Sequence, residues 1–126
     1  WPTEFHVVTQ RKGEHKNEFG YGPEGHEGVD LRAPLGSKIF ACLDGEVTFS
    51  GWKGVYGNMV RIQSTLSGKK VVIEYCHLSK IDAPSIVMRG GLIGLAGTTG
   101  NTRGPHLHLN LFIDGKRMDV APYLGV

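Results

Sequence analysis

The segment from His26 to Asp30 reads His-Glu-Gly-Val-Asp and carries two side chains that bind metal ions. Zinc accepts both imidazole nitrogen and carboxylate oxygen. The spacing looks like a broken His-Glu-x-x-His helical zinc motif, with Asp30 in place of the second histidine. Gly25 and Gly28 disfavour a helix here, but in a loop entering a strand His26 and Asp30 can still converge on one ion. Taken alone, the segment is more typical of a loop with an incidental charge pair, and Glu27 is not assigned as a general base.

A second pair, His106 and His108, begins an apolar strand directly after Pro105. Residues i and i+2 of a strand share a face, so both imidazoles would project to one side. Alone, the pair is as typical of two surface histidines. With His26 and Asp30 it makes four candidate ligands, enough for a closed structural zinc site. A catalytic site would instead use three protein ligands and keep one position open for water. The spacing alone does not decide which of the four candidate residues would not bind the metal in a catalytic site.

A third candidate is His77, which follows Tyr75 and Cys76 at the end of a strand-like run. Strand alternation predicts that Tyr75 and His77 face the same way and that Cys76 faces the other. A single histidine at a strand end is more often a packed or capping residue than a catalytic one. His6 and His15 have no motif around them, and we expect both to be structural or exposed.

Composition limits the fold and the function. The chain has 126 residues, enough for one domain, with 40% apolar and 21% charged residues, which excludes disorder, collagen and coiled coil. Its 19 glycines predict a turn-rich, mainly β protein. A net charge of +2 without a run of Lys or Arg argues against a dedicated nucleic-acid domain. No apolar stretch reaches the roughly 20 residues of a membrane span.

Other sequence features leave two questions open. The chain begins at Trp1 without a methionine or a visible signal peptide, so we expect a mature form or a domain excised from a longer protein. Cys42 and Cys76 are too few for a disulfide scaffold, and the sequence allows two free buried thiols or one bridge.

Short β-branched or aromatic runs recur between glycines and predict strands. We expect antiparallel sheets that form a barrel or sandwich in one domain, residues 1–126, with little helix beyond one turn in Leu78–Ile86. A turn at Ser64–Gly68 joins the runs Asn58–Gln63 and Lys69–Tyr75. Two glycine-rich loops, Gly20–Gly28 and Gly90–Gly104, lead to the histidines and are expected to carry function. The predicted strands are Phe5–Thr9, Lys38–Cys42, Glu46–Ser50, Asn58–Gln63, Lys69–Tyr75, Leu92–Ala96 and Leu107–Ile113, the last closing a hairpin at Asp114-Gly115.

Taken together, the short motifs resemble the lysostaphin-like (LytM-type) zinc endopeptidases, which cut peptide bonds in bacterial peptidoglycan. The resemblance runs from about Gly25 to Leu124 in family order. Each piece is weak alone, but the combination is highly specific. The matching pieces are His26-x-Gly28-x-Asp30, Ala33-Pro34-x-Gly36-Ser37, Asp44-Gly45-x-Val47, Tyr56-Gly57-Asn58, Tyr75-x-His77-Leu78-Ser79, Gly97-Thr98-Thr99-Gly100, Gly104-Pro105-His106-Leu107-His108 and Asp119 through Pro122-Tyr123-Leu124.

The resemblance implies one zinc ion held by His26, Asp30 and His108. It also implies that His106 and His77 are catalytic residues on either side of the site. Two imidazoles and one carboxylate would leave one position for a water molecule, whose pKa the metal lowers to about 7. Either catalytic imidazole could take the proton of that water, and the other could stabilise the oxyanion.

The sequence departs from the family pattern at a few positions. Where the family commonly has an aromatic residue and then an acid after the second histidine of the pair, this chain has Leu109 and Asn110. Cys76 and Cys42 replace small residues. Tyr21 is the counterpart of a tyrosine with which some relatives hold the oxyanion. We therefore expect Tyr75, Asn110 and Tyr21 to contact the substrate or to support the metal ligands.

The leading interpretation is thus a zinc metalloendopeptidase acting on stem or cross-bridge peptides of peptidoglycan. The alternative is a catalytically inactive module of the same fold that binds the cell wall or regulates another hydrolase. The enzyme is favoured because all five metal and catalytic positions are intact. We expect a monomer without a nucleic-acid partner, located outside the cytoplasm: extracellular, periplasmic, in the cell wall or on a virion. The sequence does not decide between glycyl-glycine bridges and D-amino-acid cross-links.

Overall fold

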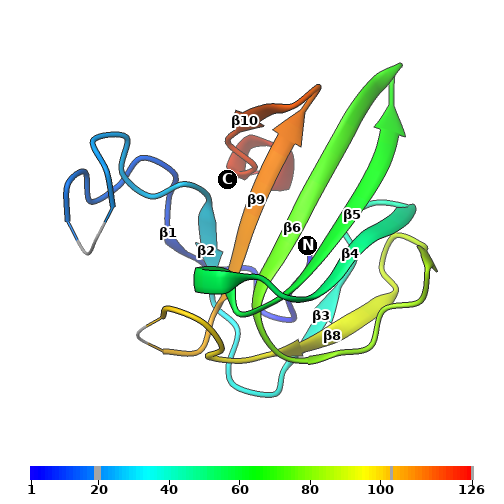
Figure 1. Ribbon diagram of the computed structural model, residues 1–126, viewed down its shortest axis with the longest axis horizontal. Coiled ribbons are helices and arrows are strands. Elements are labelled where there is room, and N and C mark those ends of the chain that lie inside the picture. The colour runs from blue at the N-terminus through cyan, green and yellow to red at the C-terminus, as the bar shows by residue number, and fades with distance from the viewer. Residues whose placement is uncertain (19–20, 103, 126) are drawn as a thin grey trace.

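The computed structural model describes residues 1–18, 21–102 and 104–125. Gly20 and Arg103, which belong to the two predicted glycine-rich loops, lie outside the described residues. Ten antiparallel strands and two short 3-10 helices, η1 (Gly54–Tyr56) and η2 (Ala121–Leu124), form the described fold (Figure 1). The strands are β1 Val8–Gln10, β2 Val29–Leu31, β3 Lys38–Phe40, β4 Gly45–Trp52, β5 Asn58–Leu66, β6 Lys69–Ile81, β7 Ile86–Val87, β8 Leu92–Ala96, β9 Leu107–Ile113 and β10 Lys116–Met118.

The sheet is organised around β6, its longest strand. The main path runs β1-β2-β9-β6-β5-β4-β7, with β10 paired to β9 and with β8 paired to both β6 and β3. Its two end strands, β1 and β7, pair with one neighbour each among the described strands, and the sheet does not close into a barrel. The expectation of a mainly antiparallel β domain is confirmed, and the closed-barrel option is excluded.

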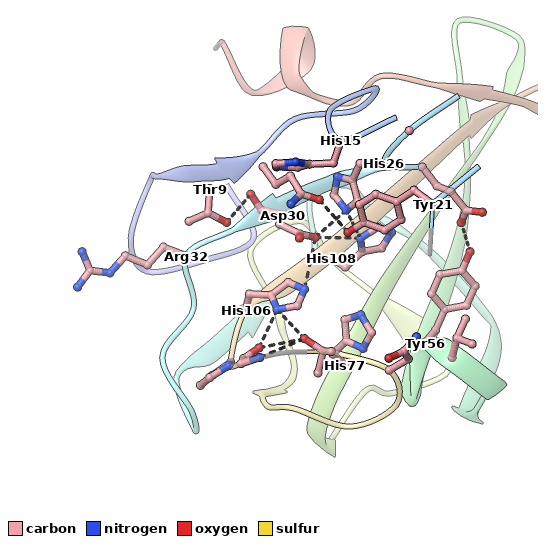
Figure 2. A pocket seen from close by; sticks show the side chains of 18 of the residues that line it. Thr9, His15, Tyr21, His26, Asp30, Arg32, Tyr56, His77, His106 and His108 are labelled. Carbon is pink, nitrogen blue, oxygen red and sulfur yellow. Dashed lines mark hydrogen bonds and ion pairs between the residues drawn. The ribbon is translucent and has the colours of Figure 1, made fainter. Parts of the chain in front are cut away.

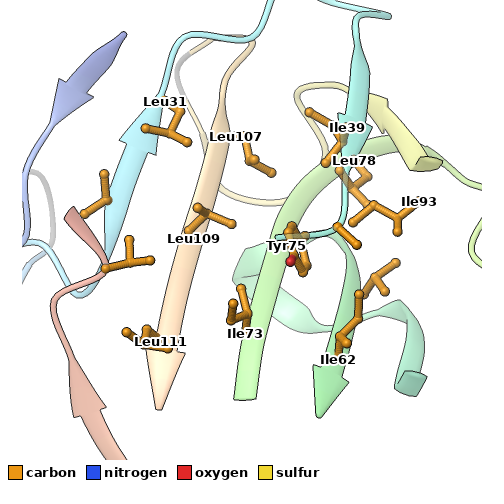
Figure 3. Packing of buried hydrophobic residues seen from close by; sticks show 14 of the residues in the cluster. Leu31, Ile39, Ile62, Ile73, Tyr75, Leu78, Ile93, Leu107, Leu109 and Leu111 are labelled. Carbon is orange, nitrogen blue, oxygen red and sulfur yellow. The ribbon is translucent and has the colours of Figure 1, made fainter. Parts of the chain in front are cut away.

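Strand β9 separates the hydrophobic core from the histidine side of the sheet. Leu109 and Leu111 lie opposite Tyr75 and Ile73 of β6, and these side chains pack together in the core (Figure 3). Because side chains alternate along a strand, His108 and Asn110 project from the other face. Both are nevertheless buried, so the second face of β9 is also covered.

The predicted strands are confirmed where apolar alternation meets a glycine or proline boundary, as at Leu92–Ala96 and Leu107–Ile113. The helical turn expected in Leu78–Ile86 is wrong, because β6 continues to Ile81 through its pairing with β8. The predicted turn at Ser64–Gly68 is shorter, since only Ser67 and Gly68, both with positive φ, leave the strands.

Two further features complete the fold. Cys42 and Cys76 are both free thiols, which answers the question that the sequence left open. Within the described part of the chain, neither short helix has the length or apolarity needed to cross a membrane.

Candidate active site

The pairing of β2 with β9 brings Asp30 directly opposite His108. His26 precedes β2, and its backbone is held by the 13–14 segment: His26 N–H donates to the Glu14 carbonyl at 2.8 Å, and Gly13 N–H donates to the His26 carbonyl at 2.9 Å. Gly25 permits this close approach, because a Cβ there would lie 2.5 Å from the Gly13 oxygen. Backbone pairing thus brings His26 and Asp30, four positions apart, together with His108, which is distant from both in sequence.

Three atoms of these side chains form a small triangle (Figure 2). His108 Nδ1 lies 2.9 Å from Asp30 Oδ1, His26 Nε2 lies 3.2 Å from the same oxygen, and the two nitrogens are 3.1 Å apart. Ligand atoms of tetrahedral zinc, about 2.0–2.2 Å from the metal, lie roughly 3.4 Å from one another. The triangle therefore needs only a slight expansion to hold such an ion.

The second nitrogen of the His26 imidazole and that of the His108 imidazole also fit a metal site. His26 Nδ1 lies 3.3 Å from the Arg11 carbonyl, which can only accept, so Nδ1 carries the proton and Nε2 presents a lone pair to the triangle. His108 Nε2 lies 2.8 Å from Asn110 Oδ1, which leaves His108 Nδ1 to face Asp30. Three acceptor atoms then meet without a proton between them, an arrangement that a cation would stabilise. The described residues therefore fit a metal ion with two nitrogen ligands and one oxygen ligand.

Two further histidines lie beside the triangle. His106 Nε2 is 3.4 Å from Asp30 Oδ1, and its Nδ1 donates to the Gly104 carbonyl at 2.8 Å. His77 Nδ1 donates to the Thr99 carbonyl at 2.7 Å, and the His77 and His106 ring centroids are 5.0 Å apart. Each imidazole thus has its Nδ1 proton engaged by a backbone carbonyl, which leaves Nε2 as the nitrogen that can exchange a proton.

A β-bulge turns His77 toward the site. His77 has a φ of +64°, and the β5–β6 register shifts next to it, between the pairs Val60↔Tyr75 and Asn58↔Leu78. The expectation that Tyr75 and His77 share a face is therefore wrong: an added residue reverses the alternation. Tyr75 lies fully buried in the core, where its hydroxyl accepts a hydrogen bond from Cys42 N–H, and it does not line the groove around the histidines.

The carboxyl of Asp30 is the electrostatic centre of the cluster. Burial raises its pKa, but contacts with the imidazoles of His106, His108 and His26 outweigh burial, and the net effect holds the pKa of Asp30 well below its usual range. Asp30 is therefore an anion at neutral pH and a suitable ligand for a divalent cation.

The two remaining imidazoles differ in their surroundings. Burial lowers the pKa of His77 to about 4, against the opposing hydrogen bond to Thr99. Burial also lowers the pKa of His106, but the hydrogen bond and charge of Asp30, with the Gly104 carbonyl, outweigh burial and raise it above its ordinary value. His77 is thus neutral near pH 7, while His106 is the better placed of the two to carry a proton.

A groove of about 970 Å³ contains all five of these side chains. Tyr21, expected near the substrate, lines it: its ring lies 5.2 Å from that of His26, and its hydroxyl donates to Gln10 at 2.8 Å. Asn110 lies beneath the groove and contacts His108. The sequence interpretation missed the opposite wall, where the Tyr56 hydroxyl donates to Glu27 and the Tyr56 ring stacks on His108. The Tyr-Gly-Asn motif at 56–58 was the one sequence feature that pointed to this wall of the groove.

Comparison with known proteins identifies the family. The profile of peptidase family M23 matches residues 24–120, and the chain belongs to this family. It is 35% identical over 117 residues to the peptidoglycan DD-endopeptidase ShyA of Vibrio cholerae, covering 91% of this chain and 24% of ShyA. The lysostaphin-like resemblance inferred from the motifs is thereby confirmed at the level of the family.

Solved structures agree with this assignment. The catalytic domain of the antimicrobial peptidase lysostaphin from Staphylococcus simulans matches with a TM-score of 0.83 at 26% identity, covering 95% of this chain and 92% of that chain. A zinc-containing peptidase from Vibrio cholerae matches with a TM-score of 0.81 at 27% identity, covering 94% and 37%. The chain spans only 21% to 24% of the length of the first curated relatives it matches.

Proposed function

We propose that this chain is a zinc-dependent endopeptidase that hydrolyses peptide bonds in bacterial peptidoglycan. The observation that carries the proposal is the triangle of His26 Nε2, Asp30 Oδ1 and His108 Nδ1, whose three acceptor atoms converge within 3.2 Å of one another. Imidazole nitrogen and carboxylate oxygen together are a ligand set that zinc accepts. One ion in this triangle is the cofactor we propose.

The two other imidazoles would carry the proton transfers. A bound zinc ion would supply a Lewis acid that polarises the scissile carbonyl and lowers the pKa of a water molecule. His77 and His106 keep Nδ1–H on backbone carbonyls and direct Nε2 to the groove. One imidazole accepts the proton of the attacking water, and the other, as a donor, stabilises the oxyanion and then protonates the leaving amine.

The nature of the substrate follows from the groove and from the relatives. The groove is open and has space for several residues of an extended peptide. ShyA is named a peptidoglycan DD-endopeptidase. We propose that peptidoglycan is also the substrate of this chain. We further propose that the chain acts as a monomer outside the cytoplasm, where peptidoglycan lies. Stem and cross-bridge peptides are both candidates for the bond that is cut.

The test combines zinc content with hydrolysis of purified cell walls. We expect about one zinc per chain, a fall in the turbidity of the wall suspension, and loss of both on treatment with a chelator, restored by added zinc. Hydrolysis that survives removal of the metal would contradict zinc dependence. Zinc binding without any hydrolysis would support the inactive binding module instead. Digestion of defined cross-linked muropeptides, with identification of the new amino terminus, would assign the bond.

A further inference from the structure

Three polar residues form a row across the sheet next to the metal triangle. Arg61 of β5 lies opposite Glu74 of β6, and Glu74 lies opposite Asn110 of β9. Asn110 shares its face with His108, two residues before it on the same strand. Glu74 is 5% exposed and Asn110 is 0% exposed, so these two members of the row are buried, while Arg61 is partly exposed. Buried polar groups are costly unless each one is paired.

Every polar atom at the centre of the Arg61–Glu74–Asn110 row has a partner. Arg61 donates to Glu74 Oε2 through Nε at 2.9 Å and through Nη2 at 2.8 Å. Asn110 Nδ2 donates to Glu74 Oε1 at 3.0 Å. Asn110 Oδ1 accepts from Arg117 Nη1 at 3.0 Å and lies 2.8 Å from His108 Nε2. The row therefore ends on an imidazole of the metal triangle.

These contacts determine which nitrogen of His108 carries the proton. A carboxylate only accepts and a guanidinium only donates. Glu74 on one side and Arg117 on the other therefore fix the orientation of the Asn110 amide, with its oxygen toward His108. That oxygen can only accept, so His108 Nε2 is protonated and Nδ1 presents its lone pair to Asp30 and His26.

We propose that the Arg61–Glu74–Asn110 row is a positioning device that selects the metal-binding tautomer of His108 and fixes the ring in place. Asn110 does so directly, and Glu74, neutralised by Arg61, keeps the Asn110 amide from turning over. A flipped amide would present a donor to His108 Nε2 and would favour the proton on Nδ1, the atom that must face the metal. This inference rests on the proposed function, because it assumes that the triangle holds zinc.

The first test compares Asn110→Leu with Leu111→Ala. Leucine has the same number and branching of side-chain heavy atoms as asparagine but no hydrogen-bonding group, whereas Leu111 is a buried core residue on the opposite face of the same strand. Zinc affinity is measured by competition with a chromophoric chelator. We expect Asn110→Leu to bind zinc roughly 10- to 100-fold more weakly, the typical effect of losing a partner of a metal-binding histidine. Leu111→Ala should lose stability but keep wild-type zinc affinity.

A second measurement does not depend on a folded variant. Nitrogen-15 NMR of the zinc-free wild-type protein should show His108 as the tautomer protonated on Nε2. Finding the proton on Nδ1, or wild-type zinc affinity in folded Asn110→Leu, would overturn the positioning role while wild-type hydrolysis stayed zinc-dependent. A wild-type protein that binds no zinc would instead overturn the proposed function and this inference together.

Discussion

At the scale of single residues, the hydrogen bond on the far side of each imidazole decides what its other nitrogen can do. The Arg11 carbonyl leaves His26 with Nε2 for the proposed metal ion, whereas the Asn110 amide leaves His108 with Nδ1. Two residues of one type thus present different atoms to the same triangle. The residue type gives the chemistry, but the hydrogen-bond partner decides which nitrogen faces the triangle. Arg11 lies 15 positions from His26, whereas Asn110 lies two positions from His108 on the same strand.

Tyr75 illustrates a residue whose chemistry suits a site but whose surroundings make it part of the core. Burial raises the pKa of its phenol well above the ordinary value of 10. A raised pKa means that the folded state holds the proton more tightly than the unfolded state. The contribution of the protonated Tyr75 phenol to the stability of the folded state is therefore complete below pH 10, and it is lost as the pH rises above that value.

We expect Tyr75→Phe to be less stable than the wild type near pH 7 by about 1 kcal/mol, because Cys42 N–H loses its acceptor. Above pH 10 the difference should shrink by up to about 1.4 kcal/mol per pH unit, since only the wild type has this phenol to ionise on unfolding. Urea unfolding of both proteins from pH 7 to 11 measures this. A difference that stays constant across the range would show that Tyr75 titrates alike in both states.

At the scale of elements, the segment after β8 is locked to the start of β5 and to β6. The Thr99 hydroxyl donates to the Leu78 carbonyl at 2.7 Å and accepts from Asn58 N–H at 3.0 Å. The carbonyl of the same residue holds His77. One threonine therefore links three segments and orients a proposed catalytic imidazole.

Thr99→Val keeps the shape of the side chain but removes both hydroxyl contacts. We expect kcat for wall-peptide hydrolysis to fall roughly 10- to 100-fold, because small displacements of catalytic groups are costly, while zinc content stays unchanged. Thr98→Val, at the exposed neighbouring position, is the matched control and should keep wild-type kcat. Unchanged kcat in Thr99→Val would mean that His77 is positioned by other contacts.

An element of this fold could be predicted from the sequence where local residues specify it, and could not where it depends on pairing with distant strands. Leu107–Ile113 was predictable because Pro105 and the turn at Asp114 bound a strongly apolar run. β2 was not, because its three residues form a strand only through pairing with β1 and β9. The bulge at His77 was equally hidden, since a positive φ at a residue other than glycine has no clear sequence signal.

The site follows the same division. The motifs at 26–30, 75–79 and 104–108 selected the five side chains that the fold brings together. Asn110, two residues after His108, was expected to support the metal ligands. The motifs gave no indication of the other partners that orient the imidazoles: the Arg11 and Thr99 carbonyls, and Glu74 behind Asn110. Such partners are set by tertiary approach, which local patterns do not contain.

At the scale of the whole molecule, the proposed metal site connects the segment that precedes β2 with strand β9. His26 and His108 are 82 positions apart, so the triangle exists only in the folded chain. A ligand that binds only the folded state shifts the unfolding equilibrium by mass action.

Zinc should therefore stabilise the metal-free protein. At a free concentration 100 times its dissociation constant, the free energy of unfolding should rise by about 2.7 kcal/mol, a shift in Tm of roughly 10 °C for a chain of this size. Calorimetry with and without zinc measures this, with magnesium, which prefers oxygen ligands, as the control ion. A Tm that does not respond to zinc would mean that the triangle is not a zinc site.

If three of the clustered residues hold zinc and two perform the proton transfers, two single variants should separate zinc content from the hydrolysis of purified cell walls. We predict that His108→Ala retains no zinc, whereas His106→Ala keeps one zinc per chain and loses at least 100-fold in rate. Loss of zinc from both variants would contradict this division of roles and would indicate a site closed by four protein ligands.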